Sequence, residues 1–147
     1  MNEDYKIWLV RAKSSLALSK AKIDEEIFYE DLCFQAQQAV EKSLKAFLVF
    51  LDIDPEKTHN LVNLIKELAK RIDIPNEINE VVILNDYAIQ TRYPGYYAPI
   101  EEDEYKKAIE KAEYCVKWID GKIKQIIKEV EDEKNQSLLD NFNLSKK

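Results

Sequence analysis

The chain has 147 residues, of which 46% are hydrophobic and 34% are charged, and its formal net charge is −6. This length suits one domain that buries a core without disulfides or metals, and the presence of only 2 glycines argues against a sheet protein rich in turns. The acidic balance disfavours broad, nonspecific nucleic-acid binding, although a local basic surface can still bind phosphate.

No segment resembles an apolar signal core or a membrane span, so we expect a cytoplasmic protein without membrane contact. Cys33 and Cys115 each fall on an apolar helical stripe, which favours buried free thiols over a disulfide or a reactive site. The chain has no CxxC and no paired Cys/His spacing. We therefore expect no zinc site, and no other cofactor is indicated.

Apolar or small residues spaced by three and four predict a first helix over residues 5–23. The second helix, from residue 27 or 28 to residue 51, has a wide apolar stripe and is expected to be the central helix of a bundle. Its other face carries a polar ridge of Gln35, Gln38, Lys42 and Lys45. Such a ridge can hold a phosphate or a nucleotide, but an ordinary solvated face gives the same pattern and is the preferred interpretation.

The residues before Pro55 end the second helix, and Thr58 is placed to cap a third helix. His59, the only histidine, falls in the first turn of that helix. A lone histidine there more often packs or forms a hydrogen bond than acts as a catalyst. A fourth helical segment begins at Pro75. Its β-branched residues 81–83 leave a strand as the alternative, but no partner strand is evident.

The connector, residues 86–100, is where we look first for function, because it holds 4 of the 8 tyrosines, 2 of the 4 prolines and 1 of the 2 glycines. Four acids at 101–104 then favour a helix N-terminus, and a fifth helix keeps one apolar face over 105–130. A close helix approach or a slight bend would explain Gly121 within it.

These patterns predict an all-α protein, a five-helix antiparallel up-and-down bundle over residues 1–132. Residues 133–147 form a polar tail that we expect to be flexible or loosely docked. A short helix that binds a partner is the alternative for this tail.

Three segments together resemble the HEPN family, and in particular its small prokaryotic members that stand alone as one domain. They are Cys-Phe-Gln-Ala-Gln-Gln-Ala-Val-Glu-Lys-Ser-Leu-Lys-Ala at 33–46, Lys-Thr-His-Asn-Leu at 57–61 and Thr-Arg-Tyr-Pro-Gly at 91–95. The resemblance covers residues 5–130. It implies the five-helix bundle, a homodimer, and pairing with a minimal nucleotidyltransferase in a toxin–antitoxin-like module.

Many HEPN proteins are metal-independent ribonucleases with an arginine, four to six intervening residues and a histidine. Arginine can hold the scissile phosphate while histidine transfers a proton. The matching arginine here is Arg92, but the permitted histidine positions hold Tyr97, Ala98 and Pro99. The resemblance therefore carries over a phosphate contact at Arg92 and no catalytic residue.

The preferred hypothesis is a noncatalytic component that binds a nucleotide or RNA. Its candidate contacts are Arg92, Tyr93, Tyr96, Tyr97, Lys42, Lys45 and His59. Modification of Tyr96 or Tyr97 by transfer of AMP from the partner is a weaker hypothesis. The enzymatic alternative is an atypical ribonuclease toxin that uses Arg92 with His59 or a tyrosine. In the purely structural alternative, Arg92 anchors the connector to residues 101–104 and the tyrosines pack the end of the bundle.

Overall fold

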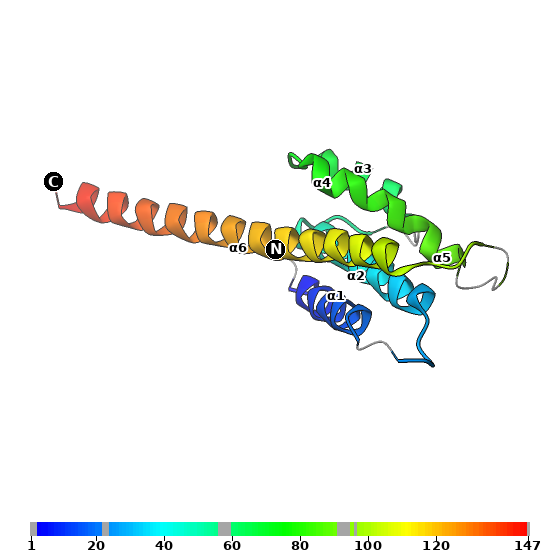
Figure 1. The fold of residues 1–147 in the computed structure, drawn as a ribbon. Helices are drawn as coiled ribbons and strands as arrows, with labels where there is room; N and C mark the ends of the chain where they lie inside the picture. Colours follow the sequence, from blue (N-terminus) through cyan, green and yellow to red (C-terminus); the bar gives the residue numbers. More distant parts are fainter. Residues whose placement is uncertain (1–2, 22–23, 56–59, 91–94, 96, 147) are drawn as a thin grey trace.

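The computed structural model describes residues 3–21, 24–55, 60–90, 95 and 97–146. These residues form helices and no β-strand, which confirms the predicted all-α fold (Figure 1). The elements are α1 (Tyr5–Ser19), α2 (Tyr29–Phe50), α3 (Leu61–Ala69), α4 (Asn76–Asn79), the 3-10 helix η1 (Glu80–Asp86), α5 (Tyr87–Gln90) and α6 (Glu102–Ser145). None of the described helices combines the length and the apolar character that a membrane crossing requires.

The second helix, α2, is the centre of the bundle, as its wide apolar stripe predicts. It packs against α1, α3 and α6, and most of its side chains from Leu32 onward are buried. The helix ends where Asp52 adopts a positive φ of 59°. There the Ile53 amide donates to the Leu48 carbonyl oxygen at 2.9 Å, which closes a Schellman-type end.

The first helix runs antiparallel to α2. Tyr5, at the start of α1, meets Phe50, at the end of α2, with their ring centroids 5.0 Å apart. Ser15, near the end of α1, meets Lys42, which lies closer to the start of α2. The two helices therefore contact each other over most of α1, and this pairing brings polar residues of both helices together.

The second and sixth helices lie side by side and run in the same direction. Tyr29 and Tyr105, near their N-terminal ends, have ring centroids 4.8 Å apart. Phe47 and Trp118, further along, are 6.1 Å apart. The apolar stripe predicted for residues 105–130 supplies this contact, so the hydrophobic core lies between α2 and the first half of α6.

The third helix begins at Leu61, and its N-cap is Asn60, whose side-chain oxygen accepts a hydrogen bond from the Val62 amide at 3.0 Å. The predicted cap at Thr58 is therefore wrong by two positions. Asparagine and threonine are both good N-cap residues, so residue type alone does not show which of the two caps the helix. Thr58 itself lies outside the described residues, and so does His59.

The fourth predicted segment is helical, so the strand alternative is excluded. It consists of the short α4, the 3-10 turns of η1 and the single turn of α5. Val81 and Leu84 of η1 point into the core. The β-branched residues 81–83 are poor α-helix formers, which explains why the middle of this segment is 3-10 helix.

The last helix is longer than the apolar stripe predicts. It continues without a break through residue 145, and every residue from 131 to 145 is exposed. This extension, residues 131–145, projects away from the bundle (Figure 1). Gly121 has no atom within 4 Å of where a Cβ would lie, so a close approach within this chain does not explain it. Flexibility of the extension stays a prediction.

Candidate functional site

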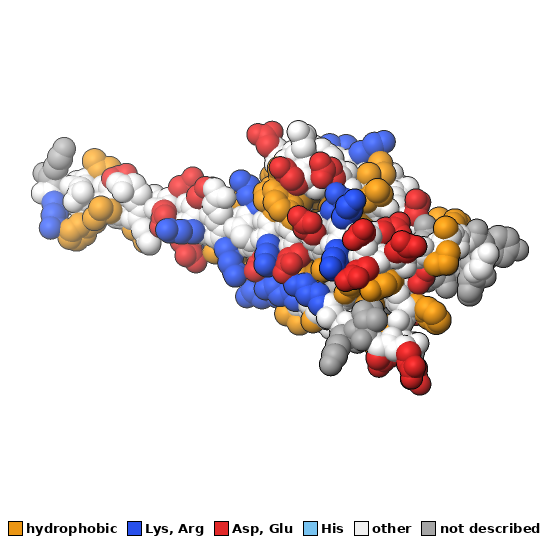
Figure 2. Space-filling view, in the orientation of Figure 1, with side chains coloured by type: hydrophobic (Ala, Val, Ile, Leu, Met, Phe, Trp, Pro, Cys, Tyr) orange, Lys and Arg blue, Asp and Glu red, His pale blue; other side chains and the backbone are white. Residues whose placement is uncertain are grey.

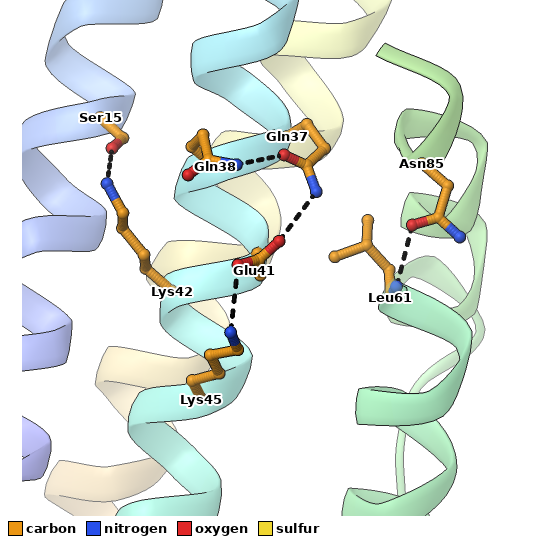
Figure 3. A network of polar contacts seen from close by, with 8 residues as sticks. All are labelled: Ser15, Gln37, Gln38, Glu41, Lys42, Lys45, Leu61 and Asn85. Carbon is orange, nitrogen blue, oxygen red and sulfur yellow. Dashed lines mark hydrogen bonds and ion pairs between the residues drawn. The ribbon is translucent and has the colours of Figure 1, made fainter. Parts of the chain in front are cut away.

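A chain of polar side chains runs along α2 on the side that carries the predicted ridge (Figure 3). Gln38 Nε2 donates to Gln37 Oε1 at 2.7 Å, and Gln37 Nε2 donates to Glu41 Oε1 at 3.2 Å. Lys45 Nζ then pairs with Glu41 Oε2 at 3.2 Å. These side chains lie next to one another on a single helix, so each hydrogen bond restricts the orientation of both side chains that it joins.

These hydrogen-bonded side chains do not form the ordinary solvated face that the sequence pattern favours. Gln37 is 0% exposed, Glu41 is 3% exposed and Lys45 is 7% exposed. The Lys45 ammonium also lies 5.5 Å from the centre of the Trp8 ring of α1. The solvated interpretation is therefore wrong for Lys45, whose charge is buried and already balanced by Glu41.

Lys42 faces a different set of groups. Its ammonium donates to Ser15 Oγ of α1 at 2.9 Å, and its side chain is half-buried. Burial lowers the pKa of Lys42 and the positive charge of Arg11 lowers it further, whereas the charge of Glu41 raises it. Arg11 lies one turn before Ser15 on α1, so the two cations are neighbours across the contact between α1 and α2. Within the described part of the chain, no carboxylate lies within ion-pair distance of either cation.

Two neighbouring cations supplied by two helices suit a phosphate oxygen chemically, and the buried Ser15 hydroxyl orients one of them. Sequence reasoning identified Lys42 but missed Arg11 and Ser15. The signal that could have found them is the antiparallel pairing of α1 with α2, which sets Ser15 opposite Lys42 and one turn beyond Arg11. We call Arg11, Ser15 and Lys42 the cationic site.

The connector is described only in part. Gly95 has a positive φ of 89°, and Tyr97 is 47% exposed, so its ring is accessible. At the end of the connector the Ile100 amide donates to Glu30 Oε1 at 2.8 Å, which ties it to the start of α2. The predicted contacts outside the described residues are Arg92, Tyr93, Tyr96 and His59.

The end of the connector and the cationic site lie at different levels of α2. Glu30, which holds the connector, precedes Lys42 by twelve positions. At a rise of 1.5 Å per residue, this separation is about 18 Å along the helix. The point at which the connector is held on α2 is therefore not part of the cationic site.

Both cysteines are buried and unpaired, as predicted. Burial raises the pKa of Cys33 to about 12 and the pKa of Cys115 to about 12, so both remain thiols at neutral pH. Thiols of this kind are poor nucleophiles and poor metal ligands. In the described ranges there is also no cluster of three or more histidine, cysteine or acidic side chains that could hold a metal ion.

An open cleft lies between α4, η1 and α6. Its volume is about 190 Å³, which is below the range of typical small-molecule sites. Three of its six lining residues are glutamates, so its charge does not favour phosphate. The lining residues are Glu77, Glu80, Lys107, Glu110, Lys111 and Tyr114.

The sequence matches the HEPN domain family over residues 5–133. An archaeal HEPN homologue, ST0689, has a similar structure with a TM-score of 0.64 and 25% sequence identity, and the match covers 81% of this chain and 97% of ST0689. TT1696 from Thermus thermophilus matches with a TM-score of 0.73 and 26% identity over 83% of this chain and 99% of TT1696. No curated protein sequence matches significantly. Since the family match spans nearly the whole bundle, the chain belongs to the HEPN domain family.

Proposed function

We propose that this HEPN protein is a noncatalytic, RNA-binding component that pairs with a minimal nucleotidyltransferase in a toxin–antitoxin-like module, as a homodimer. The observation that carries the binding role is the cationic site, where Arg11 and Lys42 lie together with no carboxylate partner among the described residues. Neighbouring cations repel one another, the charge of Glu41 offsets this only in part for Lys42, and an anionic ligand reduces the repulsion further.

The chemistry of the cationic site fits a phosphodiester. The Arg11 guanidinium offers a planar donor pair, Lys42 offers a compact charge, and Ser15 holds Lys42 in place through its hydroxyl. Lys45 has a different role in this proposal. Its ion pair with Glu41 lies within α2 and its ammonium lies over the Trp8 ring of α1, so its charge is not available to a ligand.

The spacing along α2 favours RNA over a mononucleotide. If a base stacks at the end of the connector while the cationic site holds a phosphate, the ligand spans about 18 Å, the separation of Glu30 and Lys42 along α2. Stacked nucleotides repeat about every 3.4 Å along one strand, so this distance corresponds to about five nucleotides. A single-stranded RNA held by aromatic stacking and backbone phosphates satisfies this geometry.

The noncatalytic part of the proposal rests on the sequence of the connector. The positions where a HEPN ribonuclease would place its histidine hold Tyr97, Ala98 and Pro99. Alanine and proline have no ionisable side chain, and a tyrosine lacks the imidazole that accepts and donates protons near neutral pH in a HEPN ribonuclease. Arg92 is retained as a phosphate contact in this proposal.

RNA binding is tested by fluorescence anisotropy with a labelled single strand of about twelve nucleotides and, separately, with a labelled mononucleotide. We expect Arg11→Gln and Lys42→Gln each to weaken RNA binding several-fold and the double variant to weaken it further. Lys66→Gln is the matched control, since Lys66 is an exposed lysine of α3. Equal affinity of the double variant and the control would contradict the proposed site.

The remaining parts of the proposal need separate assays. RNA cleavage and growth inhibition by the wild type, Arg92→Ala and His59→Ala test the noncatalytic role, and cleavage that is lost in Arg92→Ala would favour the ribonuclease alternative. Copurification with a small nucleotidyltransferase encoded by a neighbouring gene tests the pairing. Failure to copurify would contradict the pairing without affecting the RNA result.

A further inference from the structure

The first helix is apolar on two opposite faces. Its inner face is buried against the bundle through Tyr5, Leu9, Ala12 and Leu16. On its outer face, Ile7 is 67% exposed, Val10 is 64% exposed and Leu18 is 53% exposed. The small residues Ser14 and Ala17 continue this outer face at heptad-like spacing. A surface helix normally has one apolar face, so the outer face of α1 is a candidate docking surface.

A second unpartnered apolar surface lies on the extension. Leu138, Leu139 and Phe142 are 67%, 53% and 54% exposed, and their spacing of one, three and four residues places them on one side of the helix. Figure 2 shows hydrophobic side chains at this projecting end. The extension carries four acids and one lysine, so its net charge is 1 − 4 = −3.

The extension cannot cover α1 of its own chain while α6 remains one helix. Lys13 pairs with Asp120 and Lys20 pairs with Glu113, so α1 runs antiparallel to α6. Continuing this pairing by seven residues sets Lys6 level with residue 127. Leu138 lies eleven residues further, or about 17 Å beyond that level. The two apolar surfaces therefore lie apart along the axis of α6.

Most of the extension also lies beyond the family match. The family match ends at residue 133, and the two solved relatives are covered almost completely by only 81% and 83% of this chain. The last buried side chain of α6 is Ile123 and its last half-buried one is Val130, so a helix built only to complete the bundle could end near residue 130. The additional turns, with their own apolar cluster, need a different explanation.

We propose that two copies of the chain exchange their extensions, so that the apolar side of each extension packs on the outer face of α1 in the other copy. The net charges are opposite in sign, because α1 carries three basic residues and no acid whereas the extension has a net charge of −3. Arg11 is the basic residue of α1 that has no ion pair among the described residues, since Lys6 and Lys13 pair with Glu3 and Asp120. Ser14 and Ala17 allow a partner helix to approach closely. The exchange is closed by a twofold axis, and it covers both exposed surfaces in both copies at once.

Cysteine cross-linking tests the contact directly. The full-length variants Val10→Cys and Leu138→Cys are mixed and oxidised, and the native Cys33 and Cys115 do not compete because both are buried. We expect a disulfide-linked dimer that contains one copy of each variant. Ile83→Cys mixed with Leu138→Cys is the control, since Ile83 is exposed on η1. Cross-linking no faster than in this control would overturn the proposal.

Sedimentation of charge variants separates the exchange from other forms of self-association. Ile7→Glu/Val10→Glu places charges on the outer face of α1, and Leu138→Glu/Phe142→Glu places charges on the apolar side of the extension. Each is expected to sediment at lower mass than the wild type, with self-association at least about tenfold weaker. All four sites are exposed, so circular dichroism should remain unchanged.

Mixing the two double variants should restore part of the association, because the intact extension of one can dock on the intact α1 of the other and so form one of the two contacts. An extension variant that keeps the wild-type mass would overturn the proposal, and so would a mixture in which both variants remain at low mass. These measurements use protein without RNA, so they stand independently of the RNA-binding proposal.

Discussion

The substitution Lys45→Met removes the cation from a buried ion pair while keeping an apolar side chain of similar length beside Trp8. The two charged groups are 3.2 Å apart, and their side chains are 9% and 4% exposed. With an effective dielectric constant of about 20, their attraction is about 5 kcal/mol. Breaking a buried pair by removing one partner typically costs about 3–5 kcal/mol. Because Gln37 still donates to Glu41, we expect a loss near the lower end, about 3 kcal/mol.

Urea unfolding monitored by circular dichroism measures this loss. The matched control is Lys70→Met, which removes a surface pair with Glu67 whose side chains are 67% and 33% exposed. Such a pair contributes at most about 1 kcal/mol. The double variant Glu41→Gln/Lys45→Met should recover a large part of the stability, since the buried carboxylate is then also gone. Equal losses in Lys45→Met and Lys70→Met would refute the buried, coupled pair.

Single positions give three further predictions. Cys33 and Cys115 should not react with Ellman's reagent at pH 8 until denaturant is added, because burial raises the pKa of each thiol to about 12; fast reaction in the native protein would contradict this. Hydrogen bonds from two lysines lower the pKa of Glu113, so its stabilising contribution is present above its unfolded pKa and is lost as the pH falls through its lower folded pKa. Unfolding titrations from pH 7 to pH 3 should therefore show a smaller acid loss in Glu113→Gln than in the wild type, and identical pH profiles would argue against this pairing. Gly121→Ala should stabilise the bundle by about 1 kcal/mol in urea unfolding, since alanine favours the helix and a Cβ there meets nothing within 4 Å; destabilisation would indicate strain or a contact at that position.

The fold follows from the sequence pattern because the apolar stripes are unambiguous. The stripe of the fifth predicted helix becomes the core-facing side of α6, and the wide stripe of the second becomes the central α2. The two cysteines on these stripes are buried and unpaired, as predicted. Element ends are less well determined by pattern, since Asn60 and Thr58 are both good caps and only the structure selects Asn60.

The candidate site was only partly predictable. Lys42 and Lys45 look alike in sequence, three positions apart on one polar ridge, and only tertiary packing distinguishes them. Trp8 and Glu41 enclose Lys45, whereas Lys42 reaches across to Ser15. The periodicity of one helix carries no information on which residues of a neighbouring helix pack against its charged side chains.

The helical structure of the extension could not be predicted from its apolar pattern. Its four large apolar residues are too sparse to continue the core stripe, which indicated a loose tail. Yet the intervening residues are compatible with helix, and α6 continues through them as one element. Helix continuity depends on the absence of a breaker as well as on burial, and no proline or glycine follows Gly121.

The most direct test of the proposed function is the salt dependence of RNA binding in the wild type and in Arg11→Gln/Lys42→Gln. If both cations contact backbone phosphates, the slope of log K against log salt for single-stranded RNA should fall by about 0.7 for each lost contact, or about 1.4 in total. Affinity should fall with it, while Lys66→Gln keeps the wild-type slope. An unchanged slope and affinity in the double variant would contradict phosphate binding at the cationic site.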